Sequence, residues 1–391
     1  MISLRTAAAA LLMAGGIVLA PSPARAQGAG LLGDPGDRWL LTYLPFVRSA
    51  PNDFPEIAFR ARLWQPASWD SRVTARGEAT LEAGASFRGS RYISAEFRAP
   101  ELIEGWRFRA YASAARDARF GYNGLGNSTS NDQAVVKAGA PFFYRVHRTR
   151  YFGRAEVTRQ IRGPLLFSVA GFAEQAHFTD LPGPDRFTND FGEELKQGDV
   201  SGRAALVLDT RDNEYDTHRG LLVEAGAQVG TGGDGYHRFY GVARGWLPVR
   251  EGTVIAARLA ASNLGGTPPL DARFVLPTYD QELTVYGGPE SNRGLDAGRY
   301  AGTGVTFGNL EVHHDILNLG VYGALTAVAF VDAGRVFEAT NGDDFRITTD
   351  HLRTGYGAGL AVRLLRSTIF VFNFAGGSDG FNFSFGSGWM F

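Results

Sequence analysis

The sequence contains no cysteine, and only two of its 39 lysine and arginine residues are lysines, Lys137 and Lys196. The first absence excludes disulfide bridges and thiolate metal sites. The formal net charge of -1 gives no case for nucleic-acid binding. Beyond the N-terminal segment, no apolar run approaches the roughly 20 residues that a membrane-spanning helix needs. What the chain does have, 51 glycines and 12% aromatic residues, is unusual for a soluble domain and suits an outer-membrane barrel.

Residues 1–26 have the layout of a Sec signal peptide. A charged start precedes an apolar run from Thr6 to Ala20, and a small-x-small site ends at Ala26. We expect cleavage after Ala26, which leaves 37 basic against 40 acidic residues, and a short periplasmic segment over residues 27–37. A retained membrane anchor is the alternative, but the run is short and Pro21 and Pro23 break the helix.

Alternation with a period of two dominates from residue 38 to the end, whereas helical periodicity is hard to find. A soluble β-sandwich would bury the apolar parity, while a membrane barrel turns it to lipid and the charged parity to the lumen. Apolar faces rich in Ala, Gly and aromatic residues favour the barrel. An arginine facing lipid near the bilayer centre costs about 2 to 4 kcal/mol. We therefore predict that the charged parity faces the lumen and its neighbours face lipid. The charged parity includes Arg72, Arg76, Arg107, Arg109 and Glu224, and its neighbours include Val73, Phe108 and Val223.

About sixteen alternating segments occupy residues 38–391, and their spacing is asymmetric. The longer connections, 118–145, 179–199, 264–302 and 337–353, all follow odd-numbered segments, whereas short ones such as 161–163 follow even-numbered segments. Short periplasmic turns and longer outer loops are typical of bacterial barrels with an even strand number. The predicted fold is all-β: a single transmembrane antiparallel β-barrel of about 16 strands over residues 38–391.

The last segment, FNFSFGSGWMF, places aromatic side chains at alternate positions. They are Phe381, Phe383, Phe385, Trp389 and Phe391. We expect a final strand that closes the cylinder and faces lipid, because closure removes an exposed edge. Phe383, Phe385, Trp389 and Phe391 resemble the C-terminal sorting signal of outer-membrane proteins; an ordinary hydrophobic edge strand is the alternative.

Residues 287–302, GGPESNRGLDAGRYAG, lie in the longest connection without a regular pattern, and loops of this length are usually functional or disordered. PTYDQELTVYGGPESNRGLDAGRYAG (277–302) precedes GNLEVHHDIL (308–317), VAFVDAGRVF (328–337) and GYGAGLAVRL (355–364), and LDTRDNEYDTHRGLLVEAG (208–226) comes before them. In this order the five stretches resemble the C-terminal barrel of the BamA/TamA superfamily, or bacterial surface antigen family. The resemblance covers residues 200–391 by motif and the first strands by pattern alone.

The resemblance implies that a long sixth outer loop folds back into the lumen, where the arginine of an Arg-Gly motif meets acids on the wall. The matching positions are Arg293 and Gly294 in the loop, and Glu311 and Asp332 on the wall. The residues themselves favour this arrangement, because sixteen strands enclose a lumen too wide for side chains to fill, and a guanidinium suits paired carboxylates. Gly294 and Gly298 permit the backbone turns of a tucked loop. The alternative is that Arg293 is a solvated loop charge.

Two departures from the family pattern stand out. A hydrophobic residue usually precedes the arginine and an aromatic follows the glycine, whereas this chain has Asn292 and Leu295. Only about eleven residues separate Gln27 from the first strand, which leaves no room for the POTRA repeats that receive client proteins in the family. We therefore expect a barrel-only member.

Three functions remain open for an outer-membrane protein of a Gram-negative bacterium. The first is assembly or translocation of outer-membrane proteins, with lipid, unfolded clients or a separate periplasmic protein as partners. The second is a passive or structural pore. An enzyme has least support, because Gly-x-Ser-x-Gly and His-Glu-x-x-His motifs are absent and His313 and His314 face opposite sides of a strand. No cofactor and no nucleic-acid partner are expected.

Overall fold

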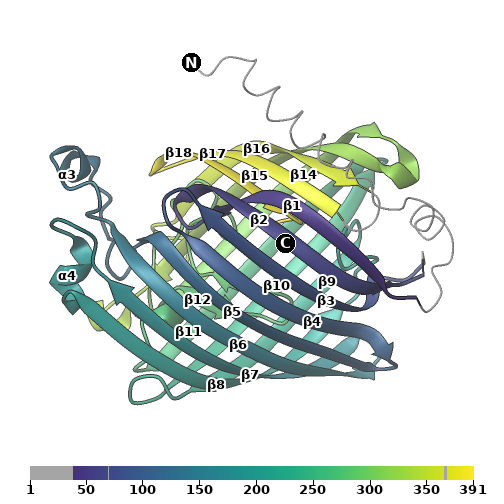
Figure 1. Ribbon diagram of the computed structural model, residues 1–391, viewed down its shortest axis with the longest axis horizontal. Coiled ribbons are helices and arrows are strands. Elements are labelled where there is room, and N and C mark those ends of the chain that lie inside the picture. Colours follow the sequence, from purple (N-terminus) through teal and green to yellow (C-terminus); the bar gives the residue numbers. More distant parts are fainter. Residues whose placement is uncertain (1–37, 69, 365–367) are drawn as a thin grey trace.

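The computed structural model describes residues 38–391 except residue 69 and residues 365–367. The predicted signal peptide and the periplasmic segment 27–37 lie outside the described residues. Within the described part, no helix is long and apolar enough to cross a membrane. Sixteen strands form one antiparallel sheet that curls into a nearly closed barrel (Figure 1).

The strands of the wall follow one another around the barrel in sequence order. They are β1 (Leu40–Ala50), β2 (Asp53–Pro66), β3 (Ala75–Ser86), β4 (Arg91–Ile103), β5 (Trp106–Gly121), β6 (Arg145–Arg162), β7 (Leu165–Thr179), β8 (Glu194–Asp209), β9 (Gly220–Gly230), β10 (Tyr236–Arg250), β11 (Thr253–Gly266), β14 (Gly304–Asn318), β15 (Gly323–Phe337), β16 (Arg353–Leu364), β17 (Thr368–Gly377) and β18 (Gly380–Ser387). Each corresponds to one predicted segment, so the predicted all-β barrel is confirmed.

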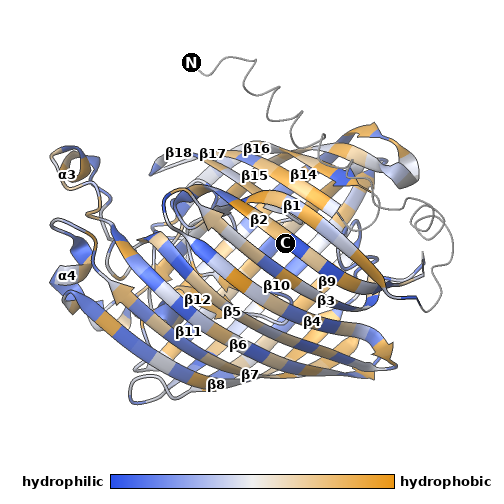
Figure 2. Ribbon diagram, viewed as in Figure 1, coloured by the Kyte–Doolittle hydropathy of each residue, from blue (hydrophilic) through white to orange (hydrophobic). Residues whose placement is uncertain are grey.

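Hydrophilic and hydrophobic residues alternate along the strands of the wall, as the colours of Figure 2 show for β5 to β8. On β9, Val223 is exposed on the outside while Glu224 is buried inside. Arg107 and Arg109 point inward, where they pair with Glu214 and Glu96. Strands of this kind form because their backbone groups pair with those of the neighbouring strand, as a membrane requires. In the described wall this pairing runs from β1 to β18 in sequence order.

The predicted start of the third segment is wrong. The strand begins at Ala75, so Arg72 and Val73 belong to the preceding connection. Val73 is buried, not exposed to lipid, and Arg72 pairs with Asp209 at 2.8 Å. The alternation in the sequence continues past the end of the strand, and so it does not mark where pairing stops.

Four long connections gather at one end of the barrel, which we call the loop end; the opposite end is the turn end. They are 122–144, 180–193, 267–303 and 338–352. Two short helices, α3 (Gln133–Lys137) and α4 (Arg186–Phe191), lie at the loop end (Figure 1). Edge-to-face ring contacts hold these connections to one another and to the wall: the ring centroids of Tyr122 and Phe187 lie 5.5 Å apart, and those of Phe120 of β5 and Phe274 lie 5.0 Å apart.

The turn end differs from expectation in two places. The connection 210–219 between β8 and β9 is not a tight turn: it folds into the lumen, where Glu214 pairs with Arg107 and Asp216 with Arg363. The last strand ends at Ser387, and residues 388–391 leave the wall.

The predicted lipid-facing row is therefore wrong for Trp389 and Phe391. Phe391 is buried inside the barrel against the ring of Trp246, with 6.4 Å between centroids. Phe383 remains exposed on the outside, and Phe385 is half-buried against Phe372 of β17. Gly388 adopts a φ of 89°, a conformation that favours glycine and lets the chain turn inward.

Candidate functional site

The site is built around the connection 267–303, which we call the inserted loop. It contains η2 (Asp271–Arg273) and a small hairpin of β12 (Val275–Pro277) and β13 (Glu282–Thr284). The hairpin is a feature that sequence reasoning missed, because three-residue strands are too short to show a period. Its tip, residues 278–281, is closed by Thr278, which donates its backbone N–H to the carbonyl of Gln281 at 2.9 Å.

Side chains of the wall satisfy the backbone of the hairpin tip. Arg154 of β6 donates to the carbonyl oxygens of Thr278 and Tyr279 at 2.8 and 2.9 Å. Glu224 of β9 accepts from the N–H of Tyr279 at 2.9 Å, and Arg109 of β5 donates to the carbonyl of Asp280 at 2.9 Å. Buried backbone groups need such partners, so the tip is held at a defined depth in the lumen.

Ion pairs add to this attachment. Asp271 pairs with Arg148 at 2.7 Å, and Asp280 pairs with Arg244 at 2.6 Å and lies 3.7 Å from Arg211. Burial alone would raise the pKa of the Asp280 carboxyl, but the guanidinium groups of Arg211 and Arg244 outweigh burial and hold its pKa well below the ordinary value. Asp280 is therefore charged at neutral and mildly acidic pH while the loop is in place.

Arg293 lies at the centre of the predicted cluster and contacts both predicted acids. Its Nη2 and Nε donate to the two carboxylate oxygens of Asp332 at 2.8 and 3.0 Å, and its backbone N–H donates to Asp332 at 3.0 Å. Its Nη1 donates to Glu311. The guanidinium carbon lies 3.4 Å from the ring centroid of Phe330. All four side chains are at least 96% buried, so the solvated-charge alternative does not describe Arg293.

The strand register explains why the two acids meet one arginine. Asn309 of β14 lies opposite Asp332 of β15, and Glu311 lies opposite Phe330. Glu311 and Asp332 are thus diagonal neighbours on the inner face. The amide of Asn309 donates to Asp332 at 2.7 Å and to the carbonyl of Ser291 at 2.7 Å, which fixes the loop beside the cluster.

Gly294 packs where no side chain fits. A Cβ on Gly294 would collide with the carbonyl oxygen of Gly376 and lie 2.7 Å from the Cα of Gly355. Gly355 of β16 and Gly377 of β17 are direct partners in the sheet, and together they form a bare floor for the loop backbone. The predicted reason for Gly294 is therefore corrected: it is needed for close approach and has no positive φ, whereas Gly298 has a φ of 71°. Gly355 and Gly377 were not predicted as site residues.

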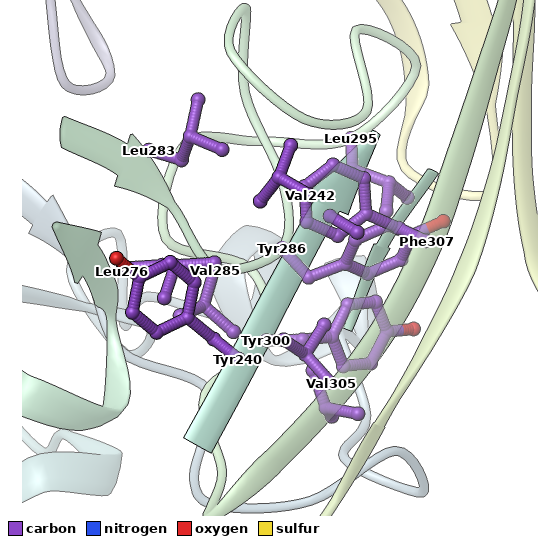
Figure 3. Packing of buried hydrophobic residues seen from close by; sticks show 12 residues of the cluster. Tyr240, Val242, Leu276, Leu283, Val285, Tyr286, Leu295, Tyr300, Val305 and Phe307 are labelled. Atoms are coloured by element: carbon purple, nitrogen blue, oxygen red, sulfur yellow. The ribbon is translucent and has the colours of Figure 1, made fainter. Parts of the chain in front are cut away.

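Asn292 and Leu295, the two residues that differ from the family pattern around the arginine, both make buried contacts. Leu295 belongs to the buried cluster drawn in Figure 3, which also contains Tyr286, Val242 and Phe307 and joins the loop to the inner wall. Asn292 is fully buried; its amide donates to the Tyr286 hydroxyl at 2.8 Å, and its side-chain oxygen accepts from the Gly294 N–H at 3.1 Å. The apolar residue usual before the arginine in the family is thus replaced by Asn292, an amide whose nitrogen and oxygen both have hydrogen-bond partners.

The cluster continues to the turn end through His313 of β14. Its Nε2 lies 2.6 Å from Glu311, and its ring stacks on Trp389 with 4.2 Å between centroids. Trp389 donates to Asp216 at 2.8 Å, and Asp216 accepts from Arg363 at 2.9 Å. One uninterrupted set of contacts therefore links the inserted loop, residues 388–391 and the connection 210–219.

Comparison with known proteins agrees with this geometry. Residues 77–389 match the Omp85 superfamily domain. The chain belongs to the Omp85 superfamily. It is an outer-membrane barrel, so its loop end is extracellular and its turn end periplasmic. No curated protein matches the chain.

Solved Omp85-type structures share the fold at low sequence identity. BamA from Haemophilus ducreyi lacking POTRA domains 1–3 is 12% identical with a TM-score of 0.55, covering 90% of this chain and 71% of that one. CdiB from Escherichia coli is 12% identical with a TM-score of 0.56, covering 88% and 61%. CdiB from Acinetobacter baumannii is 12% identical with a TM-score of 0.51, covering 89% and 59%. This Omp85 barrel thus spans about six tenths of the length of the CdiB chains.

Proposed function

We propose that this Omp85 barrel takes part in the insertion or translocation of outer-membrane proteins, through the seam between β1 and β18. The observation that carries the proposal is the sheet order, which begins at β1 and ends at β18 with no ladder joining them among the described residues. Unpaired backbone groups in a bilayer cost several kcal/mol each, and an exposed strand edge accepts another strand.

The seam is held by side chains instead. Phe54 at the start of β2 meets Phe383 of β18 edge-on, with 5.6 Å between ring centroids. Such a contact is worth about 0.5 to 1.5 kcal/mol, far less than a ladder of hydrogen bonds, so the seam is the weakest line of the wall. A client strand that pairs with the free edge of β1 or β18 would replace the Phe54–Phe383 ring contact with a ladder of backbone hydrogen bonds.

The narrow space beside the hairpin tip argues against a passive pore. The cavities beside the hairpin tip have volumes of ≈ 40 Å³ and ≈ 30 Å³, enough for a few waters. We further propose that Arg293, Gly294, Glu311 and Asp332 anchor the inserted loop and so keep the lumen shut while the seam opens. Outer-membrane lipid, unfolded clients and a separate periplasmic protein are the partners this function requires, and it involves no enzymatic step.

The absence of cysteine makes a direct test possible. Phe54→Cys/Phe383→Cys would be bridged with a thiol crosslinker that a reductant cleaves, and the protein reconstituted into liposomes. Insertion of an unfolded test barrel should stop when the seam is bridged and return after reduction. The matched control is Phe372→Cys/Phe385→Cys, which bridges register partners on β17 and β18.

Solute leakage is measured in the same liposomes. Insertion that persists across the bridged seam would refute the proposal, as would equal loss in the control. Leakage without any insertion by the unbridged protein would instead establish a passive pore.

A further inference from the structure

Three arginines gather on the outer surface near the loop end, and we call them the arginine patch. They are Arg88 in the β3–β4 turn, Arg91 of β4 and Arg116 of β5. Arg91 shares the outward parity of Ile93, whose side chain is 51% exposed. Arg116 lies directly opposite Arg91 across the two strands and so faces the same way. The patch therefore borders the surface that contacts lipid.

The patch lacks the counter-charges that arginines have elsewhere in this protein. Inside the barrel, Arg107, Arg150 and Arg293 each pair with a carboxylate. In the described part of the chain, none of the three patch side chains forms an ion pair or hydrogen bond. Like charges directly opposite each other on neighbouring strands are destabilising. A bound anion would therefore reduce the repulsion between Arg91 and Arg116.

Further along the same register row the charges are already balanced. The row continues from Arg116 through Thr149 and His177 to Lys196. His177 lies 2.7 Å from Glu194, and Lys196 pairs with the same carboxylate. Within this row, the positive charge without a carboxylate partner is thus confined to Arg91 of β4 and Arg116 of β5.

An apolar depression lies below the patch, toward the turn end. It measures ≈ 590 Å³, and its floor is made of alanines, including Ala79, Ala95 and Ala110, between the larger side chains of Leu81 and Phe97. Ala95 follows Arg91 by four residues on the same face, which places it about 13 Å away along the strand. An acyl chain on this floor would have its headgroup at the patch.

We propose that the arginine patch and this depression together bind a phosphorylated, acylated lipid of the outer leaflet. A guanidinium fork donates two parallel hydrogen bonds to a phosphate, and a bridging phosphate would remove the repulsion between Arg91 and Arg116. The alanine floor accommodates acyl chains without side-chain rearrangement. The ligand comes from the membrane because the depression opens on the lipid-facing wall.

The test is native mass spectrometry of the detergent-purified protein with added lipid A that carries two phosphates. Arg91→Gln/Arg116→Gln should bind the lipid about tenfold more weakly or worse, since hydrogen bonds between charged groups are lost. The matched control is Arg162→Gln/Arg250→Gln, two exposed arginines at the turn end, which should bind as the unaltered protein does. In neutral detergent without lipid, Arg91→Gln alone should keep or raise the melting temperature, which separates lost binding from lost folding.

Three results would overturn the proposal. Lipid A without phosphates could bind the unaltered protein equally well, which would remove the role of phosphate. The control could lose as much binding as the patch variant, which would indicate nonspecific charge attraction. Glucosamine phosphate without acyl chains could bind as tightly as lipid A, which would remove the role of the depression.

Discussion

Trp389 donates its indole N–H to Asp216 at 2.8 Å and thereby connects residues 388–391 to the β8–β9 connection inside the periplasmic mouth. The two segments come from opposite parts of the wall, and Trp389 was expected to face lipid. Because His313 stacks on the same indole, the contact also reaches the cluster around Arg293. The loop in the lumen and the closure of the periplasmic mouth are thus physically continuous.

Removal of that hydrogen bond should free the connection 210–219. Trp389→Phe keeps a ring but loses the donor, and a hydrogen bond to a charged group contributes about 1.5 to 3 kcal/mol. The lower end applies here because Asp216 is partly exposed. We expect faster trypsin cleavage at Arg219, which lies in this connection. Trp106→Phe, on the outer face, is the control. Unchanged cleavage in Trp389→Phe would mean that the hydrogen bond does not hold the connection.

Arg293 and Glu311 should be energetically coupled. Loss of one partner of a buried ion pair leaves an uncompensated charge and costs roughly 3 to 5 kcal/mol. Arg293→Ala and Glu311→Ala should each lower the temperature at which the folded band converts in unboiled gels, and the double variant should lose less than the sum. The exposed pair Lys196–Glu194 serves as control, with little effect expected. Strict additivity at Arg293 and Glu311 would show that the two side chains do not interact.

A methyl group on Gly294, between the loop and the glycine floor of the wall, should displace the loop. Gly294→Ala places a Cβ against the backbone of Gly376, and backbone cannot move aside as a flexible side chain does. We expect a lower conversion temperature and increased single-channel conductance. Gly171→Ala, at a β7 position with open space around the added Cβ, should change neither. Normal conductance in Gly294→Ala would indicate that the loop does not depend on this approach.

The attachment of the hairpin tip should persist in mild acid and weaken only at low pH. Since the folded protein lowers the pKa of Asp280, the stability it contributes is full above about pH 4 and falls as pH drops toward the folded pKa. Asp280→Asn should therefore convert at a lower temperature than the unaltered protein at pH 7 and pH 5, and the difference should shrink below about pH 4. Asp344→Asn, at an exposed loop position, is the control. A gap that stays constant down to pH 2 would contradict this account.

Strand number, order and facing could be predicted because period-two alternation follows from the geometry of a wall with lipid on one side. The contacts of Arg293 were anticipated because resemblance supplied the partners and parity placed Glu311 inward. The inward turn of Trp389 and Phe391 could not be predicted, because aromatic side chains suit both lipid and the buried patch beside Trp246. Nor could the role of Gly355 and Gly377, since a glycine in a strand carries no signal of what approaches it across the lumen.

Lys137 ends helix α3 and Lys196 lies near the start of β8, so both lysines stand at the extracellular rim. The ion pairs inside the described barrel use arginine alone among the long cationic side chains, and guanidinium groups do not react with amine-directed esters. Treatment of intact cells with a membrane-impermeant ester would therefore mark the rim and leave the lumen chemically untouched. Lys137 and Lys196 can therefore serve as two native labelling sites on the cell surface.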